Sequence, residues 1–174
     1  PLPFITAHRF LYITSLSSGA AELLPTLVQA ARQNSQLIAC NPGASQLTTE
    51  SIPALLEALP HIDILLLNMA EAIKCARSLK LTIEQLPAFL LNAGPNIVCL
   101  TDGPNGVYAH TADARHHAPT LATNIVDTVG AGDAFGSGFV GALLRDADIQ
   151  TAIAAGLRNS ASVIAQVGSQ AGLR

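Results

Sequence analysis

Short apolar runs alternate along the chain with stretches in which apolar residues recur every three or four positions, and this alternation constrains the fold more than any other feature. A continuous apolar run predicts a buried strand, whereas a period near 3.6 residues predicts an amphipathic helix. Strands that are apolar on both faces are typical of a parallel sheet covered by helices. We therefore predict an α/β protein with a mostly parallel sheet flanked by helices. Strands are expected at 10–15, 37–41, 62–67, 96–101, 107–110 and 115–119, and helices at 23–31, 48–59, 69–78, 83–92, 131–145 and 149–167.

The composition indicates a chain with a large apolar interior. Hydrophobic residues make up 49% of the 174 residues and charged residues 12%, where a share of about 25% charged is usual. This length is sufficient for one well-buried core, so we expect residues 1–174 to form a single domain. A net charge of -3 argues against a nucleic-acid partner, which would need a basic patch. No apolar run reaches the ~18 to 20 residues of a membrane-spanning helix, so no membrane partner is expected.

Cysteine and histidine give no sign of a metal site. Cys40, Cys75 and Cys99 are widely spaced and form no C-x-x-C pair, so neither a disulfide framework nor a zinc site is predicted. We expect free, reduced thiols in a cytoplasmic protein. His116 and His117 are adjacent in a segment predicted to be extended, where neighbouring side chains point to opposite faces. A shared metal ligand role is therefore disfavoured.

The most specific signal for a site is the segment DTVGAGDAFGSG, which starts at Asp127. Gly130 and Gly132 leave room for backbone amides to converge on a phosphate, and the helix expected to begin here adds the positive end of its dipole. Asp133 falls in the first helical turn. Two interpretations remain open: Asp133 stabilises the helix N-terminus, or it accepts a proton from a hydroxyl that attacks a bound phosphate.

Glycines inside the same predicted helix require an explanation. Gly136, Gly138 and Gly141 each cost roughly 1 kcal/mol relative to alanine in a helix interior. Ala134, Gly138 and Gly141 would share one helical face, so we expect them to let the helix approach a sheet closely. Such an approach would also fix the turn that precedes the helix.

The segment 127–138 resembles the second signature of the ribokinase-like, PfkB-type carbohydrate kinases. Three other segments occur in the order that this family would have them. They are the turn Asn41-Pro42-Gly43, the N-x-x-E element of Asn68 and Glu71, and the loop TDGPNG at 101–106, which is similar to the T-x-G-x-x-G nucleotide loop. The resemblance implies a three-layer ribokinase-like fold and ATP-dependent phosphoryl transfer to a hydroxyl of a sugar or nucleoside.

The resemblance also implies roles for individual residues. Asp133 would be the catalytic base, and the backbone of Gly130, Ala131 and Gly132 would form the anion hole for the transferred phosphoryl group. Many relatives bind a monovalent cation, usually K⁺, through carbonyl groups. Asp127 and Val129 match part of that cation site, and its remaining ligands would come from residues 163–168.

The nucleotide contacts follow in the same way. Asn68 and Glu71 would lie near the ATP phosphates and their hydrated Mg²⁺. Thr101, Gly103 and Gly106 would border the nucleotide, and Asn159, on the last helix, would lie near the adenine.

Other classes of nucleotide-binding protein are excluded because their sequence motifs are absent from this chain. The chain contains only two lysines, Lys74 and Lys80, and neither follows a glycine, so the G-x-x-x-x-G-K-[ST] loop is absent. The H-R-D and D-F-G signatures of protein kinases are missing. A dinucleotide-binding interpretation of the glycines also fails, because Gly136 comes one residue too late to be the third glycine of that motif.

The match covers only the second half of the family pattern. We expect the N-terminal portion of these kinases, with its Gly-Gly signature, acceptor-binding residues and β lid, to be missing. The sheet edge that this portion continues would then be exposed, which favours association with the missing portion or a homodimer. Three functions remain open: a sugar or nucleoside kinase, a truncated nucleotide-binding module without turnover, and a structural or regulatory relic.

Overall fold

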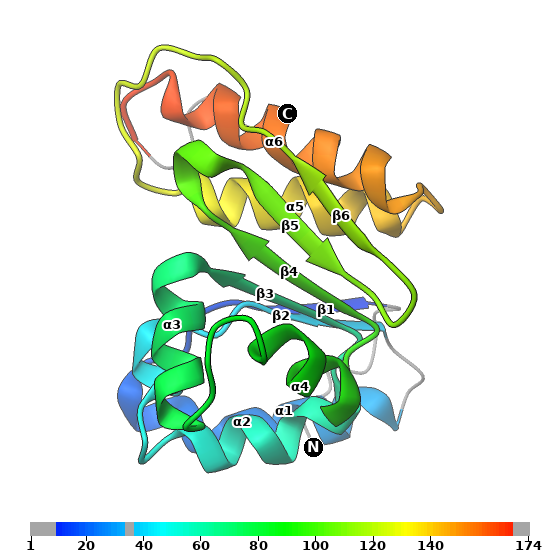
Figure 1. The fold of residues 1–174 in the computed structure, drawn as a ribbon. Coiled ribbons are helices and arrows are strands. Elements are labelled where there is room, and N and C mark those ends of the chain that lie inside the picture. Colours follow the sequence, from blue (N-terminus) through cyan, green and yellow to red (C-terminus); the bar gives the residue numbers. More distant parts are fainter. Residues whose placement is uncertain (1–9, 34–36, 169–174) are drawn as a thin grey trace. The chain divides into compact units, whose positions relative to one another are not determined.

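The computed structural model of the protein describes residues 10–33 and 37–168, and its six strands form one mixed sheet in the order β1-β2-β3-β4-β5-β6 (Figure 1). The strands are β1 (Phe10–Ile13), β2 (Leu37–Cys40), β3 (Ile64–Asn68), β4 (Ile97–Thr101), β5 (Val107–His110) and β6 (Arg115–Ala118). The helices are α1 (Leu24–Arg32), α2 (Ile52–Ala58), α3 (Met69–Ser78), α4 (Leu86–Ala93), α5 (Ala131–Leu143) and α6 (Ile149–Ile164). Short 3₁₀ turns occur at η1 (Ser18–Leu23), η2 (Ala44–Leu47), η3 (Leu59–His61) and η4 (Gly103–Asn105).

The chain divides into two compact units. The first comprises residues up to 100 together with 110–114, and the second comprises 101–109 together with the residues from 115 onward. A single domain over 1–174 therefore stays a prediction. Within the described ranges, no helix is both long enough and apolar enough to cross a bilayer.

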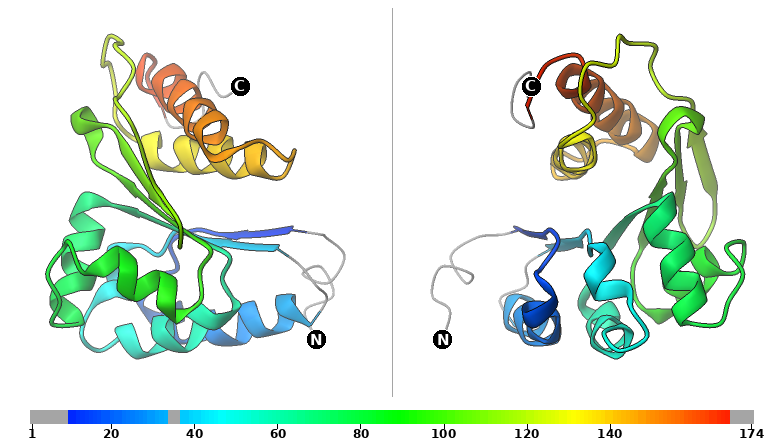
Figure 2. Two further views of the ribbon diagram at one scale, coloured as in Figure 1. Left: turned by 45° about the vertical axis from the view of Figure 1, so that its right-hand side comes forward. Right: turned by 90° about the vertical axis from the view of Figure 1, so that its left-hand side faces the viewer.

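The first unit contains the parallel strands that the apolar runs predicted. β1 pairs with β2 in parallel, with Phe10 opposite Leu37, and β2 pairs with β3 in parallel, with Ala39 opposite Ile64. Helices α1 to α4 lie along one side of these strands (Figure 2). Cys40 is completely buried, as are Cys75 and Cys99, and burial raises the pKa of the Cys40 and Cys75 thiols to about 12. The cysteines therefore act as small apolar core residues.

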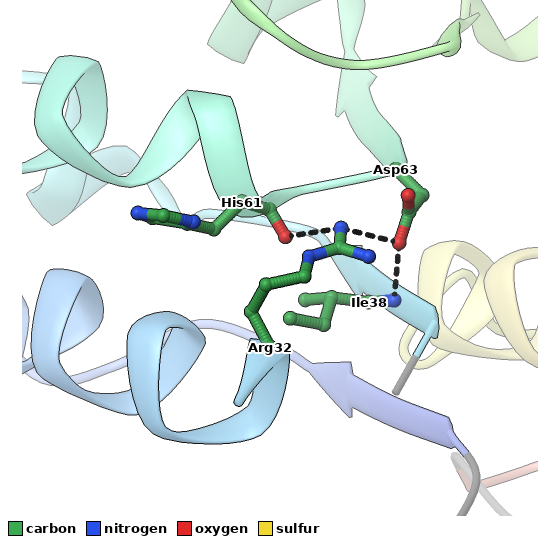
Figure 3. Close-up of polar contacts among 4 residues, drawn as sticks. All are labelled: Arg32, Ile38, His61 and Asp63. Atoms are coloured by element: carbon green, nitrogen blue, oxygen red, sulfur yellow. Dashed lines mark hydrogen bonds and ion pairs between the residues drawn. The ribbon is translucent and has the colours of Figure 1, made fainter. Parts of the chain in front are cut away.

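Asp63, which precedes β3, connects several elements of the first unit (Figure 3). Arg32, at the end of α1, uses its Nη2 to donate to Asp63 Oδ2 at 2.8 Å and to the His61 carbonyl at 2.7 Å. The same carboxylate oxygen accepts the Ile38 amide of β2 at 2.8 Å, and the Asp63 carbonyl accepts the Asn96 amide at 2.8 Å. One acidic residue thus joins α1, β2 and the start of β4.

The second unit packs α5 closely against α6. A Cβ added at Gly138 would lie 2.9 Å from the Ala155 carbonyl oxygen, and one added at Gly156 would lie 2.7 Å from the Phe135 ring. The expectation that Gly138 approaches a sheet is therefore wrong, because its close neighbour is a helix. A Cβ at Gly141 would meet only the end of the Arg145 side chain, at 3.7 Å.

Every predicted strand and helix is present, and the differences lie at the ends. α2 starts at Ile52 rather than at Thr48, with Pro53 in its first turn, where a missing N–H costs no helical hydrogen bond. Thr48 Oγ1 instead accepts the Ser51 amide at 3.2 Å and closes a turn ahead of the helix. α4 also begins later than expected, with Pro87 in its first turn.

Candidate functional site

One pocket of the second unit is lined by residues from two separate sequence motifs. Its volume is about 120 Å³, whereas a pocket that encloses a whole ligand holds ~300 to 1,000 Å³, so it fits only part of a nucleotide. Five of its lining residues were predicted to lie near a nucleotide or its phosphates. The lining residues are Thr101, Gly103, Gly106, Val107, Thr120, Ala131, Gly132, Phe135, Leu157 and Ser160.

The loop that follows β4 forms one wall of this pocket and depends on glycine. Gly103 has φ +46° and Gly106 has φ +93°, in the left-handed region that side chains rarely adopt. A Cβ at Gly106 would also overlap the carbonyl oxygen of Ala118, so no larger residue fits against β6. The Asp102 amide donates to the Gly106 carbonyl at 2.8 Å and closes the loop.

The N-terminus of α5 provides the other motif. The helix is preceded by Gly130, which has φ +83° and gives no side-chain cap. The Ala131 amide donates to Thr128 O at 3.3 Å, but the amides of Gly132 and Asp133 donate to no acceptor within residues 10–33 and 37–168. A Cβ at Gly132 would have nothing within 4 Å. The first turn of α5 therefore presents unused amides and the positive end of a 13-residue helix to open space.

Asp133 is exposed in that first turn and is not packed into the core. Its carboxylate makes no hydrogen bond or ion pair with any other residue that the structure describes. Asp133 therefore does not cap the helix by a hydrogen bond, although its negative charge still suits the N-terminal end of α5.

Asn68 and Glu71 belong to the first unit, where they form a capping box at the start of α3. Asn68 Oδ1 accepts the Glu71 amide at 2.9 Å, and Glu71 Oε2 accepts the Asn68 amide at 2.9 Å. This exchange satisfies two backbone donors at the helix end. The N-x-x-E element thus has a structural role in addition to any contact with a nucleotide.

Asp127 holds together the two segments that were expected to supply a cation site. Its carboxylate accepts the Val129 amide at 3.0 Å and the Gly168 amide at 3.2 Å. These backbone donors, Val129 first, hold the pKa of Asp127 below its usual value. The Val126 amide donates to the Ile164 carbonyl at 2.8 Å, so the loop before α5 lies against the end of α6.

Asn159 lies in the interface between α5 and α6. It is buried, and its side-chain amide donates to the Ala134 carbonyl at 2.7 Å and to Ser137 Oγ at 3.1 Å. The residues through which α6 lines the pocket are instead Leu157 and Ser160. Sequence reasoning missed both, and the only signal was their spacing of three, which puts them on one helical face.

Comparison with known proteins identifies the family. The model of the pfkB family carbohydrate kinases matches residues 2–174, so the chain belongs to this family. An adenosine kinase of Schizophyllum commune is 27% identical over 191 residues, which cover 97% of this chain and 54% of that protein. A ribokinase of Staphylococcus aureus (strain COL) is 32% identical over 140 residues, which cover 75% of this chain and 46% of that protein.

The fold is also similar to that of solved structures. The structure of a ribokinase II from E. coli in complex with ATP and Mg²⁺ superposes with a TM-score of 0.84 at 20% identity, covering 99% of this chain and 57% of that one. At this identity the similarity establishes a ribokinase-like fold. The chain spans about half the length of the curated relatives named above.

Proposed function

We propose that this chain supplies the nucleotide-binding and catalytic half of a kinase that transfers a phosphoryl group from ATP to a hydroxyl of a sugar or nucleoside. The observation that carries the proposal is the meeting of the 101–106 loop with the first turn of α5 in one pocket. Phosphoryl transfer requires mainly alignment and charge neutralisation at the phosphate oxygens. Backbone amides at a helix N-terminus meet both requirements without a lysine.

The transferring end of the reaction would use α5. The Gly130 to Gly132 turn would form the anion hole, in which the free Gly132 amide supports the role and the Ala131 amide already closes a turn with Thr128. Asp133 would accept the proton of the acceptor hydroxyl as its oxygen attacks the terminal phosphorus and ADP leaves. An exposed carboxylate without a hydrogen-bond partner among the described residues is available for that proton transfer.

The nucleotide end would use the loop and α6. Thr101, Gly103 and Gly106 would border the nucleotide, and Leu157 and Ser160 would flank the part of the base or ribose that the pocket can hold. Asn159 would hold α6 against α5 through its hydrogen bonds to α5, and its role would be to position the pocket-lining residues of α6 rather than to contact adenine.

Two cations are included in the proposal. Asn68 and Glu71 would lie near the ATP phosphates and their hydrated Mg²⁺, which would neutralise charge on the phosphate oxygens. Both side chains offer oxygen atoms, the ligands that Mg²⁺ prefers. A K⁺ site would use carbonyl groups near Asp127 and Val129, because the loop that contains these residues meets the end of α6.

The proposal is tested by calorimetric titration of the full chain with ATP and Mg²⁺. Gly132→Val projects a side chain into the open space at the α5 N-terminus, and we expect it to weaken ATP binding by about tenfold or more, a loss of ~1.4 kcal/mol. Gly19→Val is the matched control. A Cβ at Gly19 also meets nothing within 4 Å, and Gly19 lies in η1, outside the pocket-lining residues. Equal ATP affinity in the Gly132 variant and the wild type would contradict the proposal.

A nucleotide-binding module without turnover is the second candidate, and the half-length match to the relatives favours keeping it. Product formation with a panel of sugars and nucleosides separates the two. Phosphorylated product supports the kinase, whereas ATP binding without product for any acceptor supports the module.

A further inference from the structure

The strand β6 reaches the candidate nucleotide loop through one side chain, His117. The His117 ring stacks on Tyr108 of β5, with the ring centroids 4.4 Å apart and an angle of 22° between the planes. The guanidinium of Arg115 lies 4.7 Å from the centroid of the same tyrosine ring. Arg115 and His117 are two residues apart in β6 and therefore share a face. These contacts fix the position of the imidazole on the hairpin.

His117 is also hydrogen-bonded to the loop itself. Its Nε2 lies 3.1 Å from the carbonyl oxygen of Asn105, the last residue of η4. A carbonyl oxygen only accepts, so Nε2 must carry a proton and donate. Because this donor is present in both the neutral Nε2–H tautomer and the imidazolium ion, the bond does not depend on the charge of the ring.

Hydrogen bonds between residues of the loop itself also shape it. The Asp102 amide donates to Gly106 O at 2.8 Å, the Asn105 amide to Asp102 O at 2.9 Å, the Gly106 amide to Gly103 O at 3.2 Å, and Asn105 Nδ2 to Asp102 Oδ2 at 3.1 Å. All four bonds join residues within 102–106, whereas His117 comes from another strand. Both glycines have positive φ, and glycine has more conformational freedom than any other residue when it is not held. A side-chain anchor from a neighbouring strand therefore removes freedom that such a short turn would otherwise keep.

We propose that His117 is a positioning residue that holds the 103–106 loop in the conformation that receives the nucleotide. This inference rests on the proposed function, since Gly103 and Gly106 line the candidate nucleotide pocket. His117 acts through the Asn105 carbonyl. The loop is then ordered before the nucleotide binds, so the entropic cost of ordering it does not reduce the binding free energy.

Three variants separate the hydrogen bond from the ring stack. His117→Phe keeps an aromatic ring on Tyr108 and removes the donor, whereas His117→Gln keeps an N–H donor and removes the ring. His117→Ala removes both. His116→Ala is the matched control, because the His116 ring lies 3.4 Å from the Gln150 side chain, away from the loop.

The experiment measures MgATP affinity by calorimetry and amide hydrogen exchange of Asn105 and Gly106 without nucleotide. We expect His117→Phe and His117→Ala to weaken binding about fivefold, the equivalent of one neutral hydrogen bond, and to speed exchange of both amides by a similar factor. His117→Gln and His116→Ala should stay within about twofold of the wild type in both measurements.

Each other outcome overturns the inference in a recognisable way. Wild-type affinity in His117→Phe, or a Gln variant as weak as the Phe variant, would show that the hydrogen bond does not position the loop. Weaker binding without faster exchange would also overturn it, because His117 would then act on the nucleotide directly. A wild-type chain that binds no MgATP would refute the proposed function itself.

Discussion

At the scale of single residues, the candidate site uses groups that have an ordinary structural explanation as well as a chemical one. Asn68 and Glu71 cap α3, and Asp133 lies where an acid suits a helix N-terminus. Position alone therefore does not separate the two kinds of role. The two roles are separated by variants that keep the structural contribution of a residue and remove its chemical group.

Asp133→Asn removes the proposed proton acceptor and keeps the size of the side chain. We expect ATP affinity to change by no more than a few-fold and turnover to fall by ~10² or more, as loss of a general base should cause. Calorimetric titration measures the ATP affinity, and steady-state kinetics with an acceptor that the panel shows to be phosphorylated measures the turnover. Asp113→Asn, at an exposed position outside the pocket-lining residues, is the control. An unchanged rate in Asp133→Asn would remove this residue from the chemistry.

Asn68→Ser tests the N-x-x-E element. Serine caps helices about as well as asparagine, so the melting temperature should stay close to that of the wild type. The shorter side chain no longer offers the amide oxygen, and we therefore expect a higher KM for MgATP. Asn68→Ala should instead lower stability by about 1 kcal/mol through loss of the cap. If the serine variant has an unaltered KM, Asn68 is a helix cap only.

At the scale of elements, α5 and α6 pack so closely that there is no room for a side chain at Gly138. Gly138→Ala would place a methyl group 2.9 Å from the Ala155 carbonyl oxygen, in backbone that cannot move aside easily. We expect a loss of about 1–3 kcal/mol in the free energy of unfolding, as for other overpacked sites. Gly141→Ala has room, and should gain about 0.5–1 kcal/mol from helix propensity. Urea titration of both variants measures the difference, and equal stabilities would contradict the packing described for Gly138.

Asp148 caps the N-terminus of α6, where its carboxylate accepts the Thr151 amide at 2.7 Å. The hydrogen bond from that amide is the largest of the effects that lower the pKa of Asp148 in the folded state. A depressed pKa contributes stability above the unfolded value of about 3.9, and this contribution is lost as pH falls through the folded pKa. We therefore expect the wild type to melt above Asp148→Asn at neutral pH, with the gap closing below about pH 4. A gap that is independent of pH would refute this account.

The sequence predicted which elements exist better than what they touch. α3 and β5 have the predicted bounds, because a capping box starts α3 and glycine ends the turn before β5. The partner of Gly138 was predicted wrongly, since the spacing of small residues identifies a close contact but not the element that makes it. Thr120 lies in the pocket without belonging to any motif. Only the folded chain brings it there.

At the scale of the whole molecule, the chain is a member of the pfkB family carbohydrate kinases that spans about half the length of its curated relatives. A glycine loop and a helix N-terminus meet within one compact unit, at the pocket that we propose to bind the nucleotide. Selection of the acceptor is a separate property, and the panel of sugars and nucleosides addresses it.

The most direct test is an NMR titration of the backbone amides of the full chain with MgATP. We predict that the largest chemical-shift changes occur at the amides of Gly103, Gly106, Gly132 and Asp133. These amides border the pocket or, at the start of α5, find no acceptor in the part of the chain that the structure describes. No change on saturation, or changes confined to residues outside this set, would contradict the claim that the pocket of the second unit binds the nucleotide.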